Sequence, residues 1–321
     1  MKSAIIGMGV IGNVHAKVLN TIGEKLVAVC DLDERRLENF ADAKHYTDYK
    51  KMLEEVKPDV VHICTPHYLH AEMVICALDM GINVLCEKPL CISFEQIDAI
   101  LEAEKRSKAI LGVVHQNRYN PENVYLKEYL SNKNVLGGHG SVAWSRTADY
   151  YNKAQWRGTW EGEGGGALIN QALHTLDLMQ WMMGMPKQVT ARCDNFTLQD
   201  TIEVEDTATL VCTGGKTNFT FYATNGAPCF FPVSVSAKTE EGNVQVIPGK
   251  FIGQDQTIDF KKEGECFGKS CYGSGHVGLN RDFYDCVRTG RKFELDGEEG
   301  SKVIRIILSA YKSNGKPIEI K

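Results

Sequence analysis

Three short segments of the chain carry residue types that suit chemistry on a bound small molecule. The first is the glycine-rich run Gly7–Gly12, close to the N-terminus. The second holds Lys88 between a glutamate and a proline. The third holds Asn170, His174 and Asp177 after a run of glycines. A glycine turn suits phosphate binding, a lysine suits the stabilisation of charge on oxygen, and a histidine suits proton transfer.

The glycine-rich run predicts a turn that binds a dinucleotide. Gly7, Gly9 and Gly12 have the spacing G-x-G-x-x-G between a strand-like run and a helix-like segment. The first glycine permits a tight bend, the second lets the backbone approach a pyrophosphate, and the third lets the helix pack closely on the strand. Asp31 ends the next strand-like run, nineteen residues after Gly12, which is the context that this motif requires.

Asp31 also indicates which dinucleotide the turn binds. A carboxylate at this strand end accepts hydrogen bonds from the adenosine ribose and repels a 2′-phosphate. Arg35 and Arg36 follow closely and are able to swing towards a phosphate, but we favour a solvated helix face for both. The sequence therefore predicts NAD rather than NADP.

Lys88 follows an apolar run that ends at Glu87, and the preceding apolar run ends at Thr65 and Pro66. In a doubly wound sheet, ligands bind at the carboxyl ends of the strands. A lysine held there beside a nicotinamide can stabilise the developing alkoxide. The alternative, an exposed lysine in a turn, explains this position less well.

The third segment predicts one long amphipathic helix, Ala167–Met183. Asn170, His174 and Asp177 fall near one face of it, because their separations are four and three residues. A histidine suits removal of a hydroxyl proton while hydride leaves the same carbon. The alternative is a core histidine that is hydrogen-bonded within the helix packing.

The first third of the chain alternates strands and helices, and its strands are apolar throughout. Such strands are buried on both faces, which predicts a parallel, doubly wound α/β sheet covered by helices. The predicted strands are Ala4–Gly7, Leu26–Asp31, Val60–Thr65, Asn83–Glu87 and Ile110–His115, and the predicted helices are Val10–Ile22, Asp33–Ala41, His70–Met80 and Phe94–Lys105.

After Arg118 the pattern changes to helices and consecutive alternating strands, which predicts an α+β domain on an open, largely antiparallel sheet. We therefore expect a Rossmann domain over residues 1–118 and a substrate-binding domain over 119–321. Two helices, Leu279–Thr289 and Gly297–Ser313, are predicted to close the second domain. Its open sheet needs a cover, and pairing in a homodimer or homotetramer is one solution.

Composition is that of an ordinary globular protein of two domains. The 321 residues include 36 basic and 41 acidic side chains, a net charge of -5 that does not suit nucleic-acid binding. The eleven cysteines contain no C-x-x-C pair, so we expect structural thiols and no metal site. Apolar runs are too short to span a membrane, and a strand at the very start leaves no room for a signal peptide, which predicts a cytoplasmic location.

Together these segments resemble the glucose–fructose oxidoreductase and inositol dehydrogenase family, Gfo/Idh/MocA. The resemblance covers nearly the whole chain and includes the segments 116–119 (QNRY), 156–160 (WRGTW) and 297–300 (GEEG). It implies a Rossmann domain followed by an α/β domain whose open sheet forms subunit contacts. It also implies that Lys88 is the catalytic lysine, that a cis bond precedes Pro89, and that His174 is the catalytic histidine.

One position departs from the family pattern. Many members, inositol dehydrogenases included, have aspartate where this chain has Asn170. An amide can position a hydroxyl but cannot act as a base, which leaves His174 as the candidate base. The asparagine resembles branches that act on sugars or sugar nucleotides. Asp177 either orients His174 or serves as a capping or salt-bridging group.

The predicted substrate residues are aromatic rings that stack on sugars, arginines that bind carboxylates or phosphates, and a histidine after a glycine-rich loop. Each can equally be an ordinary packing or surface residue. The predicted substrate-binding residues are Arg118, Tyr151, Trp156, Arg157, Asn170, His174 and His276. The predicted cofactor-binding residues are Gly7, Met8, Gly9, Val10, Ile11, Gly12, Asp31, Thr65, Pro66, His70, Glu87, Lys88 and Gln116.

The hypothesis that unites these residues is reversible hydride transfer between NAD and a secondary hydroxyl of a sugar, a sugar derivative or an inositol. Lys88 stabilises the alkoxide-like oxygen and His174 exchanges the proton, so the two must meet at one carbon. Two alternatives use the same residues. One is an NAD-dependent enzyme that cleaves glycosides through transient oxidation, and the other is a non-catalytic sensor that binds NAD.

Overall fold

The computed structural model describes residues 1–260, 267 and 273–321, and the chain divides into two compact units. The first unit contains Met1–Gln116 and the described residues within 263–301. The second contains the described residues from Asn117 to Phe260 together with Lys302–Lys321. The predicted second domain, 119–321, therefore differs from the structure, because its residues 273–301 belong to the first unit.

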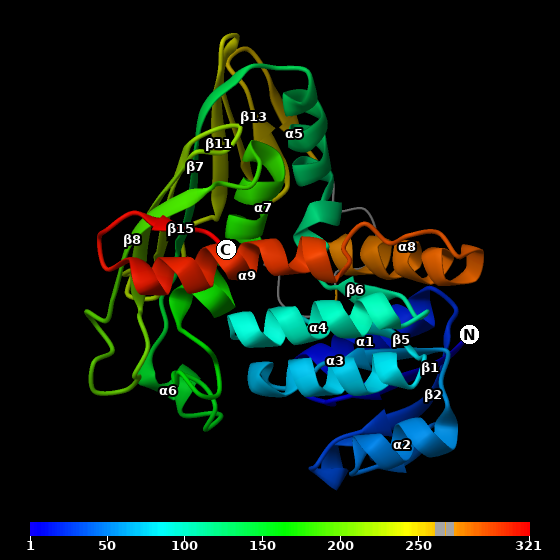
Figure 1. Ribbon diagram of the computed structural model, residues 1–321. Coiled ribbons are helices and arrows are strands. Elements are labelled where there is room, and N and C mark those ends of the chain that lie inside the picture. The colour runs from blue at the N-terminus through cyan, green and yellow to red at the C-terminus, as the bar shows by residue number, and fades with distance from the viewer. Residues whose placement is uncertain (261–266, 268–272) are drawn as a thin grey trace. The chain divides into compact units, whose positions relative to one another are not determined.

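A six-stranded parallel sheet forms the centre of the first unit (Figure 1). Its order is β3-β2-β1-β4-β5-β6, so the chain starts in the middle and winds outwards to both sides, as predicted for a doubly wound sheet. Residues of the central strands are buried because their side chains are apolar and are covered on both faces. The strands are β1 (Lys2–Ile6), β2 (Lys25–Cys30), β3 (Lys44–Tyr46), β4 (Val60–Ile63), β5 (Asn83–Cys86) and β6 (Leu111–Val113).

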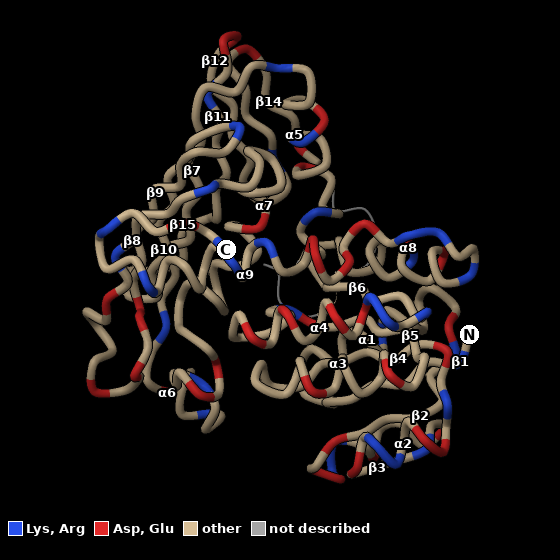
Figure 2. The backbone as a smooth tube through the Cα atoms, in the orientation of Figure 1, with Lys and Arg blue, Asp and Glu red and all other residues tan. Residues whose placement is uncertain are grey.

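Helices pack on this sheet in pairs, with α1 against α8 and α3 against α4. Both α2 and α8 carry acidic as well as basic residues (Figure 2), and pairs such as Arg288–Asp285 at 2.9 Å offset one another. The helices of the first unit are α1 (Val10–Thr21), α2 (Tyr49–Val56), α3 (His70–Asp79), α4 (Phe94–Arg106) and α8 (Gly275–Thr289).

The segment after β2 differs from its prediction. A helix is predicted over Asp33–Ala41, whereas the structure has only the single 3₁₀ turn Glu34–Arg36. Leu37 is the one buried residue between 33 and 41, so this segment has no apolar face that could hold a helix on the sheet. β3 and α2 follow and are not predicted, since β3 is a short edge strand with no fully buried residue.

Helix α8 returns to the first unit although it follows the whole second sheet in sequence. The ring of Phe283 fills the space beside Gly112, where an added Cβ would lie 2.7 Å from it. The Tyr284 hydroxyl lies 2.7 Å from Ser3 Oγ and 2.8 Å from His62 Nε2. Periodicity predicts this helix, but not the partner on which it packs.

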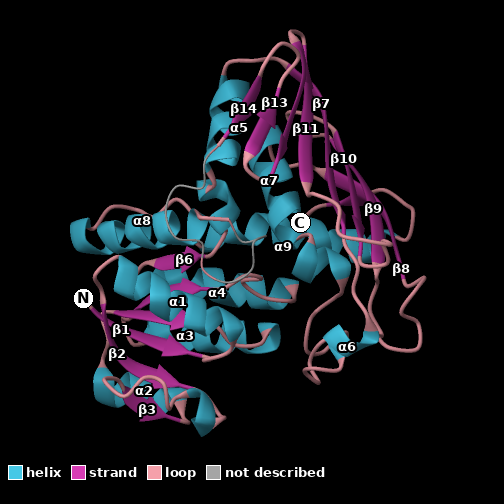
Figure 3. Cartoon of the chain, turned by 180° about the vertical axis from the view of Figure 1, so that it is seen from behind, coloured by secondary structure: helices cyan, strands magenta, loops and turns pink. Residues whose placement is uncertain are grey.

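The second unit contains a nine-stranded sheet in the order β14-β13-β12-β11-β7-β10-β9-β8-β15 (Figure 3). All neighbouring pairs are antiparallel except β10 with β7, which confirms the predicted largely antiparallel sheet. The strands are β7 (Val135–Ala143), β8 (Gln188–Asp194), β9 (Thr207–Thr213), β10 (Phe219–Thr224), β11 (Ser234–Thr239), β12 (Gly242–Ile247), β13 (Lys250–Ile252), β14 (Thr257–Asp259) and β15 (Ile318–Glu319).

Helix α7 covers one face of this sheet. Gly138 and Gly140 of β7 allow the close approach, because an added Cβ at Gly140 would lie 2.8 Å from Met179. The helices of this unit are α5 (Pro121–Ser131), α6 (Ala148–Tyr151) and α7 (Leu173–Met183), and α9 (Gly297–Ser313) begins in the first unit and ends in the second.

Among the described residues, no helix combines the length and the apolar character needed to cross a membrane. In that same part of the chain, His, Cys, Asp and Glu side chains form no group of three or more that is arranged to hold a metal ion.

Candidate active site

Five strand ends of the first unit lie in register at one edge of the sheet. Ile6 pairs with both Cys30 and Ile63, Ile63 pairs with Cys86, and Cys86 pairs with Val113. Nine of the thirteen predicted cofactor residues lie within three residues after one of these five positions. They are Gly7, Met8, Gly9, Asp31, Thr65, Pro66, Glu87, Lys88 and Gln116.

The glycine turn at this edge has the shape that its motif predicts. Gly7 has a φ of +91°, and a Cβ there would lie 2.6 Å from the carbonyl oxygen of Cys64. At Gly12 a Cβ would overlap the carbonyl oxygen of Gly7. At Gly9, by contrast, the nearest atom is Arg36 Nη1 at 4.0 Å, so the backbone of this glycine is open to a close-lying group.

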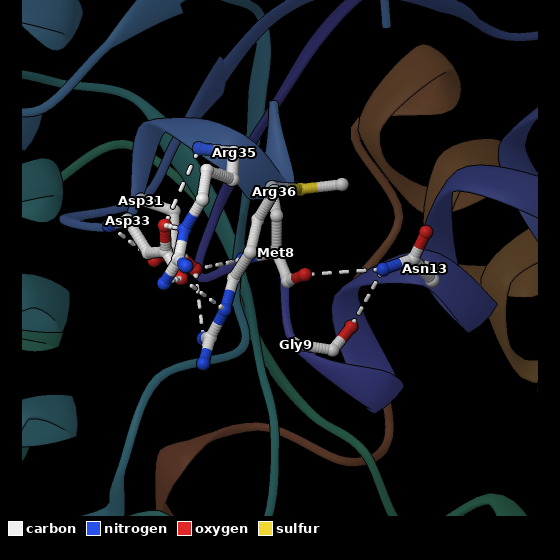
Figure 4. A network of polar contacts seen from close by, with 7 residues as sticks. All are labelled: Met8, Gly9, Asn13, Asp31, Asp33, Arg35 and Arg36. Atoms are coloured by element: carbon white, nitrogen blue, oxygen red, sulfur yellow. Dashed lines mark hydrogen bonds and ion pairs between the residues drawn. The ribbon is translucent and has the colours of Figure 1, made fainter. Parts of the chain in front are cut away.

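Asp31 is tied to the glycine turn (Figure 4). One of its carboxylate oxygens accepts a hydrogen bond from Met8 N at 2.7 Å, and the other accepts one from Asp33 N at 2.9 Å. Asn13, which the sequence reading missed, donates to the carbonyl oxygens of Met8 at 3.0 Å and Gly9 at 2.8 Å. These bonds fix the turn and its carboxylate as one unit.

The two arginines after Asp31 both pair with Asp33, but Arg36 also reaches Asp31 (Figure 4). Arg35 pairs with Asp33 at 2.8 and 2.9 Å and is largely exposed, as predicted for a solvated residue. Arg36 lies 3.4 Å from the Asp31 carboxylate and 3.6 Å from that of Asp33. A cation therefore stands beside the group that is expected to bind the ribose.

His70, a predicted cofactor residue, is fully buried and contacts backbone. Its Nδ1 lies 2.7 Å from the carbonyl oxygen of Pro89, and its Nε2 lies 2.8 Å from that of Thr65. Burial lowers the pKa of the His70 imidazole, although both carbonyl oxygens favour the charged form. The ring thus connects the two strand ends that carry Thr65 and Lys88.

Lys88 is half-buried, and the Lys88–Pro89 peptide bond is cis, as the resemblance implies. The preceding residue, Glu87, accepts from Lys88 N at 3.2 Å and contacts His15 Nε2 at 2.9 Å. Burial acts to raise the pKa of Glu87, but the His15 hydrogen bond and nearby cations outweigh it, and the pKa falls to about 2. Glu87 is therefore a carboxylate at neutral pH.

A buried hydrogen-bonded network continues from Glu87 through the first unit. His15 Nδ1 lies 2.7 Å from His62 Nδ1, and His62 Nε2 lies 2.8 Å from the Tyr284 hydroxyl. Since the Glu87 carboxylate only accepts, His15 donates to it from Nε2 and, when neutral, accepts from His62 at Nδ1. His62 then accepts from Tyr284, and burial holds its pKa well below the usual value.

His276 lies beside this network. It lies in the first turn of α8, almost fully buried, with its ring centroid 6.1 Å from that of His15. Burial lowers the pKa of His276 to about 4. The structure therefore places His276 on a helix rather than in the expected glycine-rich loop, and its contact with substrate stays a prediction.

In the second unit, the predicted helix Ala167–Met183 is interrupted. A π-helical turn, Ala167–Gln171, precedes α7. The buried Glu205 carboxylate accepts from Gly166 N at 2.8 Å and from Leu168 N at 2.9 Å, which accounts for the local geometry. Burial raises the pKa of Glu205 to about 7. No sequence signal points to Glu205, because its partners are two backbone N–H groups and the hydroxyl of Tyr311, 106 residues later in the chain.

Asn170 lies on the π-helical turn, and its amide nitrogen donates to the buried Glu163 carboxylate. The other Glu163 oxygen accepts from Gly158 N at 2.5 Å. His174 follows on α7 and is half-buried. Of the roles left open for Asp177, the structure shows a salt bridge, with Arg118 Nη2 at 2.6 Å.

Two predicted substrate residues, Arg118 and Tyr151, are buried within the second unit. Arg118 is buried in its bidentate ion pair with Asp177. Tyr151 is buried against Leu198, Ile202 and Val204, and its hydroxyl accepts from Asn225 Nδ2 at 2.8 Å. In the sequence, an aromatic residue close to arginines is typical of a ring that stacks on a sugar. In the structure, apolar neighbours cover the ring of Tyr151.

Trp156 and Arg157 remain partly exposed. The Arg157 guanidinium lies 4.6 Å from the ring centroids of both Tyr150 and Trp156, and one of its nitrogens donates to the Tyr150 hydroxyl. The Tyr150 hydroxyl also accepts from Gln171 Nε2 at 3.2 Å. Tyr150, which the sequence reading missed, thus joins these two residues to the segment that carries Asn170.

Two family models match the chain. The model described as "Oxidoreductase family, NAD-binding Rossmann fold" matches residues 1–115, and the model described as "GFO/IDH/MocA C-terminal domain" matches residues 134–247. Together they cover more than half of the chain, with one match in each unit.

Curated relatives and a solved structure are also similar. D-glucoside 3-dehydrogenase of Escherichia coli (strain K12) is 32% identical over 205 residues, which cover 61% of this chain and 58% of the relative. Inositol 2-dehydrogenase of Salmonella paratyphi B is 30% identical over 194 residues, which cover 57% and 54%. The matches thus span a little over half the length of these relatives. The WlbA dehydrogenase from Chromobacterium violaceum, solved with NADH and UDP-GlcNAcA, is 28% identical, with a TM-score of 0.89 over 100% of this chain and 96% of that chain.

Proposed function

The chain belongs to the Gfo/Idh/MocA oxidoreductase family, and from this premise we propose that it is an NAD-dependent dehydrogenase of a sugar, a sugar derivative or an inositol. The observation that carries the proposal is the register of the five strand ends, which gathers the glycine turn, Asp31 and Lys88 at one sheet edge. The relatives named as glucoside and inositol dehydrogenases support the substrate class.

The residues of the first unit fit NAD. The open backbone at Gly9 leaves space for a pyrophosphate, and the Asp31 carboxylate can accept from ribose hydroxyls. His70 holds Thr65 and Pro89 at their strand ends, so we assign it a positioning role rather than a cofactor contact. When bound, NAD supplies the acceptor for the hydride.

Lys88 and His174 serve the same reaction in this proposal. The Lys88 ammonium donates to the substrate oxygen and stabilises the charge that develops as its carbon loses hydride. His174 takes the hydroxyl proton and returns it in the reverse direction. Asn170 positions a hydroxyl, since its amide cannot remove a proton.

A test of this proposal measures NAD reduction with glucosides, inositols and nucleotide sugars. Wild-type protein and a Lys88→Met variant are compared, with Lys105→Met, an exposed lysine near the end of α4, as the matched control. We expect at least one sugar to reduce NAD, and Lys88→Met to lose turnover while it still binds NADH. Wild-type turnover in Lys88→Met would refute the role. Release of a cleaved sugar without net formation of NADH would indicate glycoside cleavage by transient oxidation.

We also propose that the chain forms a homo-oligomer through the second sheet. Along β9 and β10, buried side chains alternate with side chains on the opposite face of the sheet, away from α7. This second face exposes Val211 and Tyr222. Pairing of such faces covers an open sheet. Val211→Asp is expected to lower the molar mass measured by light scattering, whereas Leu32→Asp, at an exposed site in the first unit, is not.

A reducing compartment, the cytoplasm, is the location that we propose. The nine described cysteines are free thiols, and most of them are buried, while Cys266 and Cys271 lie outside the described residues. Fractionation of cells that express the tagged protein tests this location, and recovery from an oxidising compartment would contradict it.

A further inference from the structure

Arg146, in the second unit, lies in an aromatic cage. Its guanidinium carbon is 5.2 Å from the ring centroid of Trp144, 4.8 Å from that of Tyr150 and 5.0 Å from that of Phe230. The one hydrogen bond that its side chain makes in the described part of the chain goes from Nη1 to the Ser145 carbonyl oxygen at 3.2 Å. The rings hold the guanidinium in place, since such stacking restricts an otherwise flexible side chain.

Apart from the Ser145 carbonyl oxygen, this guanidinium has no hydrogen-bond acceptor among the described residues. Arg146 Nε is shielded from solvent and has no hydrogen-bond partner among the described residues, and no described carboxylate pairs with Arg146. Arg118 of the same unit shows the usual alternative, because it also stacks on a ring, that of Trp181, yet both Nε and Nη2 bind Asp177. A shielded donor without an acceptor is unusual in a folded protein and calls for an explanation.

A second cation shares the Tyr150 ring. The guanidinium carbon of Arg157 lies 4.6 Å from the centroid of the Tyr150 ring. Its Nη1 lies 3.9 Å from a carboxylate oxygen of Glu163. Glu163 is itself buried and already accepts from Gly158 N and Asn170. The one carboxylate that lies near Arg157 among the described residues is therefore largely occupied by other donors.

The same tyrosine connects these cations to the proposed substrate site. The Tyr150 hydroxyl accepts from Gln171, the neighbour of Asn170 on the π-helical turn, and His174 follows three residues later. Gln171 is held in turn by Asn225 Nδ2 at 3.0 Å. A group bound between the arginines would thus be fixed relative to the helix that carries His174.

We propose that Arg146, Tyr150 and Arg157, here called the arginine stack, bind an anionic group of the substrate. The site fits a carboxylate or a phosphate on a sugar, because a guanidinium offers both classes paired donors and the rings can stack on the sugar face. Arg146 Nε is the donor that such a group would satisfy. This inference rests on the proposed dehydrogenase function and narrows its substrate to anionic sugars.

The experiment measures binding to the NADH-loaded protein by calorimetry, so that no turnover is needed. D-glucose is the neutral probe, D-glucuronate is the carboxylate probe and α-D-glucose 1-phosphate is the phosphate probe. The quantity of interest is the affinity ratio of each anion to glucose. Wild-type protein is compared with Arg146→Gln and Arg146→Lys, and Arg192→Gln, an exposed arginine on β8, is the matched control.

We expect the wild-type protein to bind one of the anions at least about tenfold more tightly than glucose, in line with a charge-assisted hydrogen bond. Arg146→Gln should abolish this preference. Arg146→Lys should retain part of it, because lysine keeps the charge but lacks the paired N–H donors of a guanidinium. Arg192→Gln should keep the wild-type ratio. Added salt should weaken the binding of the anion and leave the binding of glucose unchanged.

Two results would overturn the inference: no anion preference in the wild-type protein, or an unchanged preference in Arg146→Gln. If Arg146→Gln fails to fold, Arg146→Lys tests the inference instead. A full anion preference in Arg146→Lys would show that the paired N–H donors of the guanidinium are not needed. The identity of the better anion separates a carboxylate from a phosphate. Oxidation of neutral sugars by a protein without anion preference would contradict this inference and leave the dehydrogenase proposal intact. Preferred binding of an anion by a protein that reduces NAD with no sugar would contradict only the dehydrogenase proposal.

Discussion

At the scale of single residues, Asp31 has two tasks. It accepts from Met8 N and so fixes the glycine turn, and it stands where a ribose hydroxyl is expected. The nearby Arg36 lies 3.4 Å from this carboxylate and 3.6 Å from that of Asp33. Removal of the carboxylate would therefore release a cation at the position that a 2′-phosphate would occupy.

An Asp31→Ser substitution tests this arrangement. We expect the Kd of NADH to rise about tenfold or more, because a charged hydrogen-bond acceptor is lost, and the Kd of NADPH to fall. Adding Arg36→Ala should remove the gain for NADPH, whereas adding Arg35→Ala should not, because Arg36 contacts Asp31 whereas the ion pair of Arg35 is with Asp33. Fluorescence titration of the bound nicotinamide measures both constants. NADPH affinity that persists without Arg36 would contradict the role of this arginine.

The buried histidines connect residue chemistry to stability. The pKa of His276 is about 4 in the folded protein and about 6.5 when the residue is unfolded. The unfolded chain therefore binds more protons between these values, so stability is full above pH 6.5 and falls as the pH drops towards 4.

His276→Gln should flatten this dependence. Between pH 7 and pH 5 we expect the wild-type free energy of unfolding to fall by about 2 kcal/mol more than that of the variant. Urea unfolding at both pH values measures the difference. His45→Gln, an exposed histidine on β3, is the control and should follow the wild type. Equal losses in wild type and His276→Gln would show that this imidazole is not held neutral by the fold.

At the scale of elements, apolar runs predicted most of the first sheet. β1, β2, β4 and β5 were found because buried parallel strands are apolar throughout, and the glycine turn was found because its spacing is encoded locally. β3 was not found, because a three-residue edge strand leaves no hydrophobic pattern. The π-helical turn was not found either, since it depends on the distant Glu205.

Glu205 holds the element that carries Asn170 and leads to His174. Glu205→Gln would place an NH₂ group against the N–H groups of Gly166 and Leu168, so at least one acceptor is lost. We expect a loss of about 1–3 kcal/mol in the free energy of unfolding, the usual cost of an unsatisfied buried donor. The kcat should fall while the Kd of NADH stays the same, because Glu205 lies outside the NAD-binding unit.

Glu203→Gln, at an exposed site two residues earlier, is the control. Chemical denaturation and steady-state kinetics are measured on both variants. Should Glu205→Gln match Glu203→Gln in stability and in kcat, the carboxylate would not be a positioning residue for the π-helical turn.

At the scale of the whole molecule, sequence order and packing diverge. Residues 273–301 follow the second sheet in sequence but belong to the first unit, where Tyr284 of α8 contacts Ser3, 281 residues earlier in the chain. Helical periodicity shows which face of α8 is apolar and not which sheet will cover it. For the same reason the sequence indicates a loop at His276, whereas the structure places this residue at the start of α8 beside His15.

Lys88 and His174 belong to different units, so kinetics offers the test of whether they serve one reaction. Lys88→Met and His174→Gln should each lower kcat by about a hundredfold or more, in the range known for lost electrostatic and acid–base catalysis. If both act on the same transition state, the double variant should be little slower than the slower single variant, because residues that act as a unit are not additive. NADH binding should be unchanged in all three. Fully additive losses in the logarithm of kcat would mean that the two side chains act in separate steps, and the shared mechanism would then fail.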